Sequence, residues 1–160
     1  MAGPSKIVGI DTQILIFAHK QVFVNKDQEQ FGLRANRLIK SLMDQNTRIV
    51  ISMITIGEYL AGVAENDRPK IGQEMMERYL VAPYNLRACV LSAKLTPMIK
   101  KLVDNDRQVL FADAKIVGSL AAYPCSVLYT YDLASKMAKI AQSLAMEVKP
   151  LPGQFEMPFN

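Results

Sequence analysis

Short apolar runs alternate along the chain with longer segments in which apolar residues recur every three or four positions. Three runs rich in β-branched residues predict buried strands at 6–10, 48–52 and 126–130, and 146–151 is a candidate for a fourth. The periodic segments predict helices over 12–19, 28–43, 53–65, 67–80, 86–103, 111–122 and 133–145, and Pro97 is a possible break in the fifth of them. Strands separated by helices require crossover connections, which favour a mostly parallel sheet. The expected fold is therefore α/β, a three-layer α/β/α sandwich around a central sheet.

Composition narrows the class of protein. The 160 residues are 50% hydrophobic, which suits one domain, expected over 1–151, with a proline-rich tail over 152–160. The excess of 19 basic over 15 acidic residues mildly favours a polyanionic partner. Cys89 and Cys125 lack the spacing of a zinc or redox site, so we expect reduced thiols and a cytoplasmic protein. We expect neither export nor a membrane-spanning segment.

Four acidic residues occupy positions near the predicted ends of strands. Asp11 and Asp132 each directly follow a strand. Glu58 lies two turns into the helix after the second strand, and Asp113 lies at the start of the helix before the third. Because ligands of parallel sheets bind beyond the carboxyl ends of the strands, the four side chains can converge there. Clustered carboxylates repel one another unless a cation neutralises them, and ligation by oxygen alone favours Mg²⁺ or Mn²⁺.

Each of these acids also has an ordinary structural explanation. Asp11, Asp113 and Asp132 can each cap the N-terminus of a helix, and Glu58 can be a solvated helix residue. Their joint placement favours a shared metal site over four separate roles. Other chemistries lack their motifs, because His19 is the only histidine and neither a GxSxG elbow nor a phosphate-binding glycine loop occurs.

Four segments resemble the motifs of PIN-domain nucleases in order and spacing. They are IVGIDTQILIFA, ISMITIGEYLAGV, FADAKIVGSLA and VLYTYD. The resemblance covers the chain from Ile7 to Leu151 and is close to the toxin ribonucleases of VapC type. It implies a parallel sheet sandwiched by helices and metal-dependent endonucleolytic cleavage of RNA. It also implies that the catalytic and metal-binding residues are Asp11, Glu58, Asp113 and Asp132, with Thr12 and Thr130 orienting the carboxylates.

The mechanism expected of such a site is hydrolysis by a metal-activated water, which leaves 5′-phosphate and 3′-hydroxyl ends. Glu58 or Asp132 can accept the proton of that water. The basic residues expected to hold the RNA backbone are Lys20, Arg34, Arg37, Lys115 and Lys136. The resemblance further implies a homodimer and a small antitoxin partner.

Two positions depart from the pattern of PIN-domain nucleases. Gln13 stands where many members have asparagine, and Ala134 stands where they often have a further acid. These departures leave open a catalytically degenerate PIN-like module that only binds RNA or protein. A receiver-like signalling domain is a second alternative, but it needs paired acids after the first strand, where this chain has one.

Overall fold

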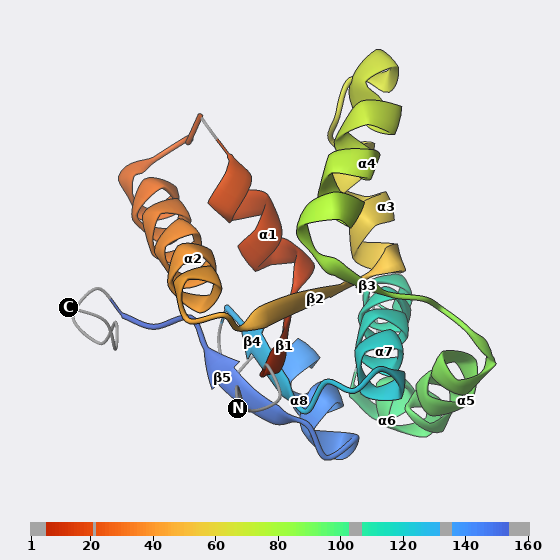
Figure 1. Ribbon diagram of the computed structural model, residues 1–160. Coiled ribbons are helices and arrows are strands. Elements are labelled where there is room, and N and C mark those ends of the chain that lie inside the picture. The colour runs from red at the N-terminus through yellow and green to blue at the C-terminus, as the bar shows by residue number, and fades with distance from the viewer. Residues whose placement is uncertain (1–5, 21, 103–106, 132–135, 154–160) are drawn as a thin grey trace, which may run out of the picture.

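The computed structural model describes residues 6–20, 22–102, 107–131 and 136–153. Within them, a parallel sheet in the order β3-β2-β1-β4-β5 forms the centre of the molecule (Figure 1). The strands are β1 (Ile7–Ile10), β2 (Arg48–Ser52), β3 (Leu80–Ala82), β4 (Val127–Thr130) and β5 (Glu147–Pro150). In the register, Val8 pairs with Ile49 and Gly9 pairs with Leu128. The expected α/β fold with a mostly parallel central sheet is confirmed.

Helices cover both faces of this sheet. They are α1 (Thr12–His19), α2 (Lys26–Asp44), α3 (Met53–Ala61), α4 (Arg68–Arg78), α5 (Leu86–Lys94), α6 (Thr96–Leu102), α7 (Arg107–Ala122) and α8 (Lys136–Ser143). Figure 1 shows α1 and α2 on one side of the sheet and α5, α6 and α7 on the other, while α3 and α4 extend from it together. No helix in the described part of the chain combines the length and the apolar content that a bilayer crossing needs.

The alternation of side chains along the strands produces two hydrophobic cores. Ile49 and Ile51 belong to the core under α1 and α2, whereas Val50 between them belongs to the core under α7 and α8. All three side chains are buried because both faces of a parallel sheet are covered. This double burial explains why the strands appear in the sequence as continuous apolar runs.

Side-chain caps set the points at which several helices begin. The carboxylate of Asp11 accepts from the N–H of Ile14 at 2.8 Å, and the hydroxyl of Ser52 accepts from the N–H of Ile54 at 3.1 Å. Asp11 directly follows β1 and Ser52 is the last residue of β2, so β1 runs into α1 and β2 runs into α3 almost without a loop. The first residues of both helices therefore lie at the carboxyl edge of the sheet.

The sequence-based boundaries were wrong at three places. The helix expected over 67–80 ends at Arg78, and Leu80 is instead the first residue of the edge strand β3, which was not predicted. The helix expected over 53–65 ends at Ala61. The segment 86–103, where a break was expected to be possible at Pro97, is divided two residues earlier, at Leu95, into α5 and α6. A strand of three residues carries too little periodicity to be recognised. The division into a domain over 1–151 and a tail stays a prediction, since 154–160 lie outside the described residues.

Candidate functional site

Asp11 lies at the junction of β1 and α1 and is only 5% exposed. Its Oδ1 accepts from the N–H of Ile14, and its Oδ2 accepts from the N–H of Tyr131 at 3.3 Å, just beyond the end of β4. Its own N–H donates to the carbonyl of Tyr129 at 3.1 Å. Asp11 is therefore a helix cap, as the structural alternative expected, but each carboxylate oxygen keeps a further lone pair for a ligand.

Glu58 and Asp113 face the same cavity as Asp11 from two different helices. The cavity measures about 340 Å³ and is lined by Asp11, Thr12, Gln13, Glu58, Asp113, Tyr131, Lys136 and Met137. Asp113 lies well inside α7, which begins at Arg107, so it does not cap that helix. Glu58 is an exposed residue of α3. Three of the four predicted acids thus line one cavity at the carboxyl edge of the sheet.

The charges of these acids act on one another. Burial raises the pKa of Asp11 from 3.8 to about 6, against the lowering effect of its backbone hydrogen bonds, and the charge of Glu58 raises it further. Burial also raises the pKa of Asp113 to about 6, with added contributions from the charges of Glu58 and Asp11, while Lys136 opposes the shift. A pair of carboxyl groups whose pKa values are raised by burial and by each other's charge is a frequent feature of functional sites.

The donor set suits a hard cation, although the side chains do not yet converge on one point. Among the described residues, no three carboxylate, imidazole or thiolate side chains have the spacing of a metal site. Glu58 is exposed at the rim of the cavity, so its side chain can rotate toward Asp11 and Asp113 without disturbing the core. The fourth predicted ligand, Asp132, lies outside the described residues. No histidine or cysteine is among the described residues that line this cavity, and its three acids offer carboxylate oxygens, the ligands that Mg²⁺ and Mn²⁺ prefer.

Two buried threonines fix the helices that carry the acids. The hydroxyl of Thr12 on α1 donates to the hydroxyl of Thr55 on α3 at 3.0 Å. This bond joins the first turn of α1, which follows Asp11, to α3, where Glu58 lies one turn after Thr55. Thr12 therefore helps to set the position of Asp11 relative to Glu58 by holding the two helices together. Thr130 is fully buried at the end of β4. The sequence analysis missed Thr55 and Tyr131, although a buried threonine one turn before a candidate acid is a recognisable signal.

The structure separates the five basic residues that were expected to hold RNA. Lys136 lines the acidic cavity, and Lys20 lines an adjoining one together with Glu58. Arg37 and Lys115 are exposed on α2 and α7. Arg34 has a different role, because its Nε and Nη2 donate to the carbonyls of Pro152 and Leu151, each at 2.8 Å. Its guanidinium thus joins residues 151–152, which follow β5, to α2, and these bonds favour a structural role over contact with RNA.

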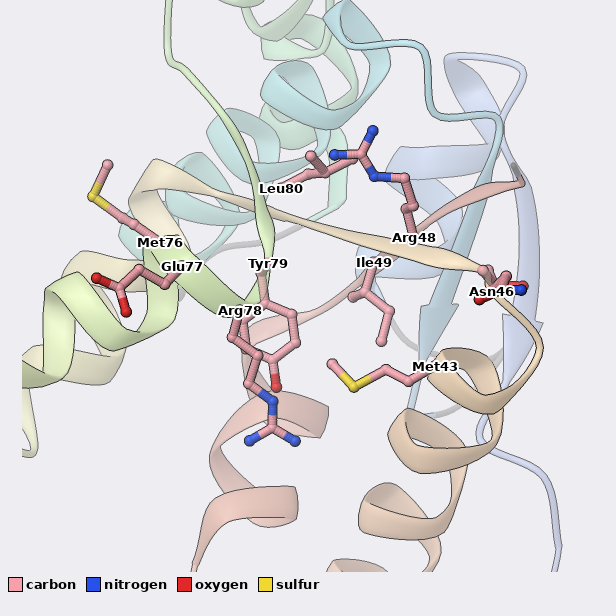
Figure 2. A pocket seen from close by; sticks show the side chains of 10 residues that line it. Met43, Asn46, Arg48, Ile49, Met76, Glu77, Arg78, Tyr79 and Leu80 are labelled. Atoms are coloured by element: carbon pink, nitrogen blue, oxygen red, sulfur yellow. The ribbon is translucent and has the colours of Figure 1, made fainter. Parts of the chain in front are cut away.

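A larger cavity of about 540 Å³ lies elsewhere, at the amino ends of β2 and β3 (Figure 2). It is on the opposite edge of the sheet from Asp11, because all strands are parallel. Figure 2 shows the guanidinium groups of Arg48 and Arg78 pointing to different sides of it. Glu77 is the only acid among its lining residues. The larger cavity therefore offers neither a converging anion site nor clustered carboxylates.

Comparisons with known proteins identify the fold. No protein-family model matches the sequence, and a search of curated proteins finds no match. Among solved structures, one match is a chain of VapBC2 from Rickettsia felis, in a complex bound to a promoter DNA fragment. It is 17% identical to this protein with a TM-score of 0.57, and the match covers 90% of this chain and 98% of that one. A chain of VapBC-1 from nontypeable Haemophilus influenzae is 20% identical with a TM-score of 0.61, covering 91% and 98%. A chain of DNA-bound VapBC from Salmonella typhimurium is 16% identical with a TM-score of 0.60, covering 92% and 99%.

These likenesses extend over nearly the whole of each matched chain. At 16 to 20% identity they define the fold of this protein, which is the α/β/α arrangement that the resemblance to PIN-domain nucleases implied. The expected fold is confirmed at this level. The roles of the individual acids are a separate matter and depend on the geometry described above.

The raised pKa of Asp11 predicts how stability depends on pH. Because the folded protein binds this proton more tightly than the unfolded chain, the stabilisation is full below pH 3.8 and is lost as pH rises through about 6. Asparagine at position 11 can keep the cap to Ile14 but does not titrate. As pH rises from about 4 to about 7, the free energy of unfolding of Asp11→Asn should therefore increase relative to that of the native protein by about 2 kcal/mol. Urea denaturation in chelator measures this, with the exposed Asp67→Asn as control, and a difference that stays constant with pH would contradict it.

Proposed function

We propose that this protein is a divalent-metal-dependent endoribonuclease and the toxin of a toxin-antitoxin pair. The observation that carries the proposal is the placement of Asp11, Glu58 and Asp113 around one cavity at the carboxyl edge of the sheet, with mutual repulsion among their charges. The likeness of the fold to chains from three VapBC complexes supports it, as does the resemblance of the four sequence motifs to VapC-type nucleases. Asp132 completes the proposed quartet.

The residues of the cavity divide the chemistry among them. Mg²⁺ or Mn²⁺ bound by the carboxylates would lower the pKa of a water ligand and stabilise charge on the phosphate oxygens. Asp11 is held in place by two backbone N–H groups, so it supplies a fixed carboxylate at the base of the site. Glu58, at the exposed rim, or Asp132 accepts the proton of the attacking water. Lys136 attracts the phosphate backbone to the same cavity. Since no side chain acts as nucleophile, the products carry 5′-phosphate and 3′-hydroxyl ends.

An antitoxin and a second copy of the chain belong to this proposal as partners. The three structural neighbours come from complexes named VapBC, two of them bound to DNA. An antitoxin segment that enters the acidic cavity would pair an arginine with the carboxylates. Such pairing would relieve the repulsion among the carboxylates, as a bound cation would. We place the protein in the cytoplasm, where free thiols stay reduced.

Digestion of labelled single-stranded RNA tests the proposal. We expect cleavage with Mg²⁺ or Mn²⁺, loss of cleavage in excess chelator, and recovery when the metal is added back. The recovery controls for damage by the chelator. Cleavage that continues undiminished in chelator would refute metal dependence. Retained RNA binding without any cleavage would favour the catalytically degenerate module, which the departures at Gln13 and Ala134 allow.

A further inference from the structure

A second cavity adjoins the acidic one and shares Glu58 with it. It measures about 260 Å³ and lies between the end of α1 and the second half of α3. The residues that line it are Ile16, His19, Lys20, Glu58, Tyr59, Gly62 and Val63. Because Glu58 lines both cavities, a polymer held at the acids can continue directly into this second space. A polynucleotide at the acids would therefore place a neighbouring nucleotide here.

Aromatic rings held in fixed positions form part of this second cavity. The rings of His19 and Tyr59 meet edge to face, with centroids 6.1 Å apart and planes at 90°. His19 Nε2 lies 2.8 Å from the hydroxyl of Tyr79, whose ring also packs edge to face against it. Tyr59 is half-buried, and Ile16 beside it is 37% exposed. The result is a rigid, partly open apolar surface next to a cluster of acids.

A cation lies at the end of this surface. The ammonium of Lys20 is 3.3 Å from Gln28 Oε1 and 5.2 Å from the centroid of the Phe17 ring, which holds it at the end of α1. Proteins bind single-stranded nucleic acids by combining a positive charge for the backbone with aromatic rings on which bases stack. The second cavity offers both features, with Tyr59 on α3 and Lys20 at the end of α1.

We propose that this second cavity binds the base of a nucleotide next to the scissile phosphate, stacked on Tyr59, with Lys20 on the adjoining backbone phosphate. The inference rests on the proposed ribonuclease function and specifies its substrate as single-stranded RNA, because a paired base cannot leave its helix without cost. Tyr59 is a substrate-binding residue here. His19 is a positioning residue, since it contacts Tyr59 and is itself fixed by Tyr79.

The test combines a change in the protein with a change in the RNA. An oligonucleotide that the protein cuts is prepared with a single abasic nucleotide at successive positions on both sides of the cut bond. For the native protein, removal of one neighbouring base should lower kcat/KM by about tenfold. Tyr59→Leu should cut intact RNA about tenfold more slowly and be insensitive to that abasic position. The comparison variant Tyr59→Phe keeps the ring and should therefore stay sensitive to that abasic position.

The outcomes separate the two proposals. If the native protein cuts RNA but Tyr59→Leu shows the same sensitivity to abasic positions, the inference about the second cavity is overturned and the ribonuclease function stands. If the native protein neither cuts nor binds the oligonucleotide, the ribonuclease function falls and takes the inference with it. Equal cleavage by Tyr59→Leu and Tyr59→Phe would also overturn the stacking role, because the two variants differ only in the aromatic ring.

Discussion

Replacement of Asp113 by asparagine is expected to reduce RNA cleavage by at least about a hundredfold. Changing a residue that merely orients a metal ligand costs about 10- to 100-fold in metal affinity or activity, so loss of a ligand should cost more. Asp113 lines the acidic cavity from α7, and its charge is coupled to those of Glu58 and Asp11. Asparagine has the same shape, so packing is preserved while the charge disappears. Single-turnover cleavage of labelled RNA at saturating Mg²⁺ measures the effect.

Stability provides an internal control for this variant. Asp113→Asn removes a charge that burial and two neighbouring carboxylates disfavour. The metal-free variant should therefore resist unfolding at neutral pH at least as well as the native protein. An inactive but stable protein cannot owe its inactivity to misfolding. Asp67 is the exposed last residue of the 3-10 turn Glu65–Asp67, directly before α4, and Asp67→Asn should retain full cleavage. Cleavage by Asp113→Asn within a few-fold of the native rate would contradict its assignment as a ligand.

The sequence was sufficient for the parts of the fold that bury apolar side chains on both faces of the sheet. β2 was predicted over 48–52 and lies there, because three consecutive buried residues leave a continuous apolar run. The strand–helix junctions at Asp11 and Ser52 carry residue types that favour helix caps. β3 was missed because it is short, lies at the sheet edge and directly follows α4.

The sequence predicted which acids lie close together at the candidate site, but not the contacts around them. The rule that ligands bind at the carboxyl ends of parallel strands correctly brought Asp11, Glu58 and Asp113 to one cavity. Hydrogen bonds between distant residues leave no local pattern, so the bonds from Arg34 to the carbonyls of Leu151 and Pro152 were not foreseen. The metal and the role of Asp132 stay predictions.

Gly118→Val is expected to lower the free energy of unfolding by about 3 kcal/mol or more. Inserting extra methylene groups into a well-packed core costs up to about 3 kcal/mol, and valine adds a whole branched side chain. A Cβ at Gly118 on α7 would lie 2.8 Å from the carbonyl oxygen of Ala88 and would collide with the hydroxyl of Ser92, both on α5. That hydroxyl donates to the carbonyls of Ala88 at 2.8 Å and Ala114 at 3.0 Å, so it joins the two helices.

Gly57→Val is the matched control, because Gly57 is also helical but has no atom within 4 Å of the added Cβ. Valine and glycine have similarly low helix propensities, so this change should alter the free energy of unfolding by no more than about 0.5 kcal/mol. Urea denaturation compares the two variants, and equal midpoints would show that α5 and α7 are not in the close contact described here. Because α7 also carries Asp113, forcing the helices apart should displace that carboxylate, so the contact at Gly118 links helix packing to the geometry of the acidic cavity.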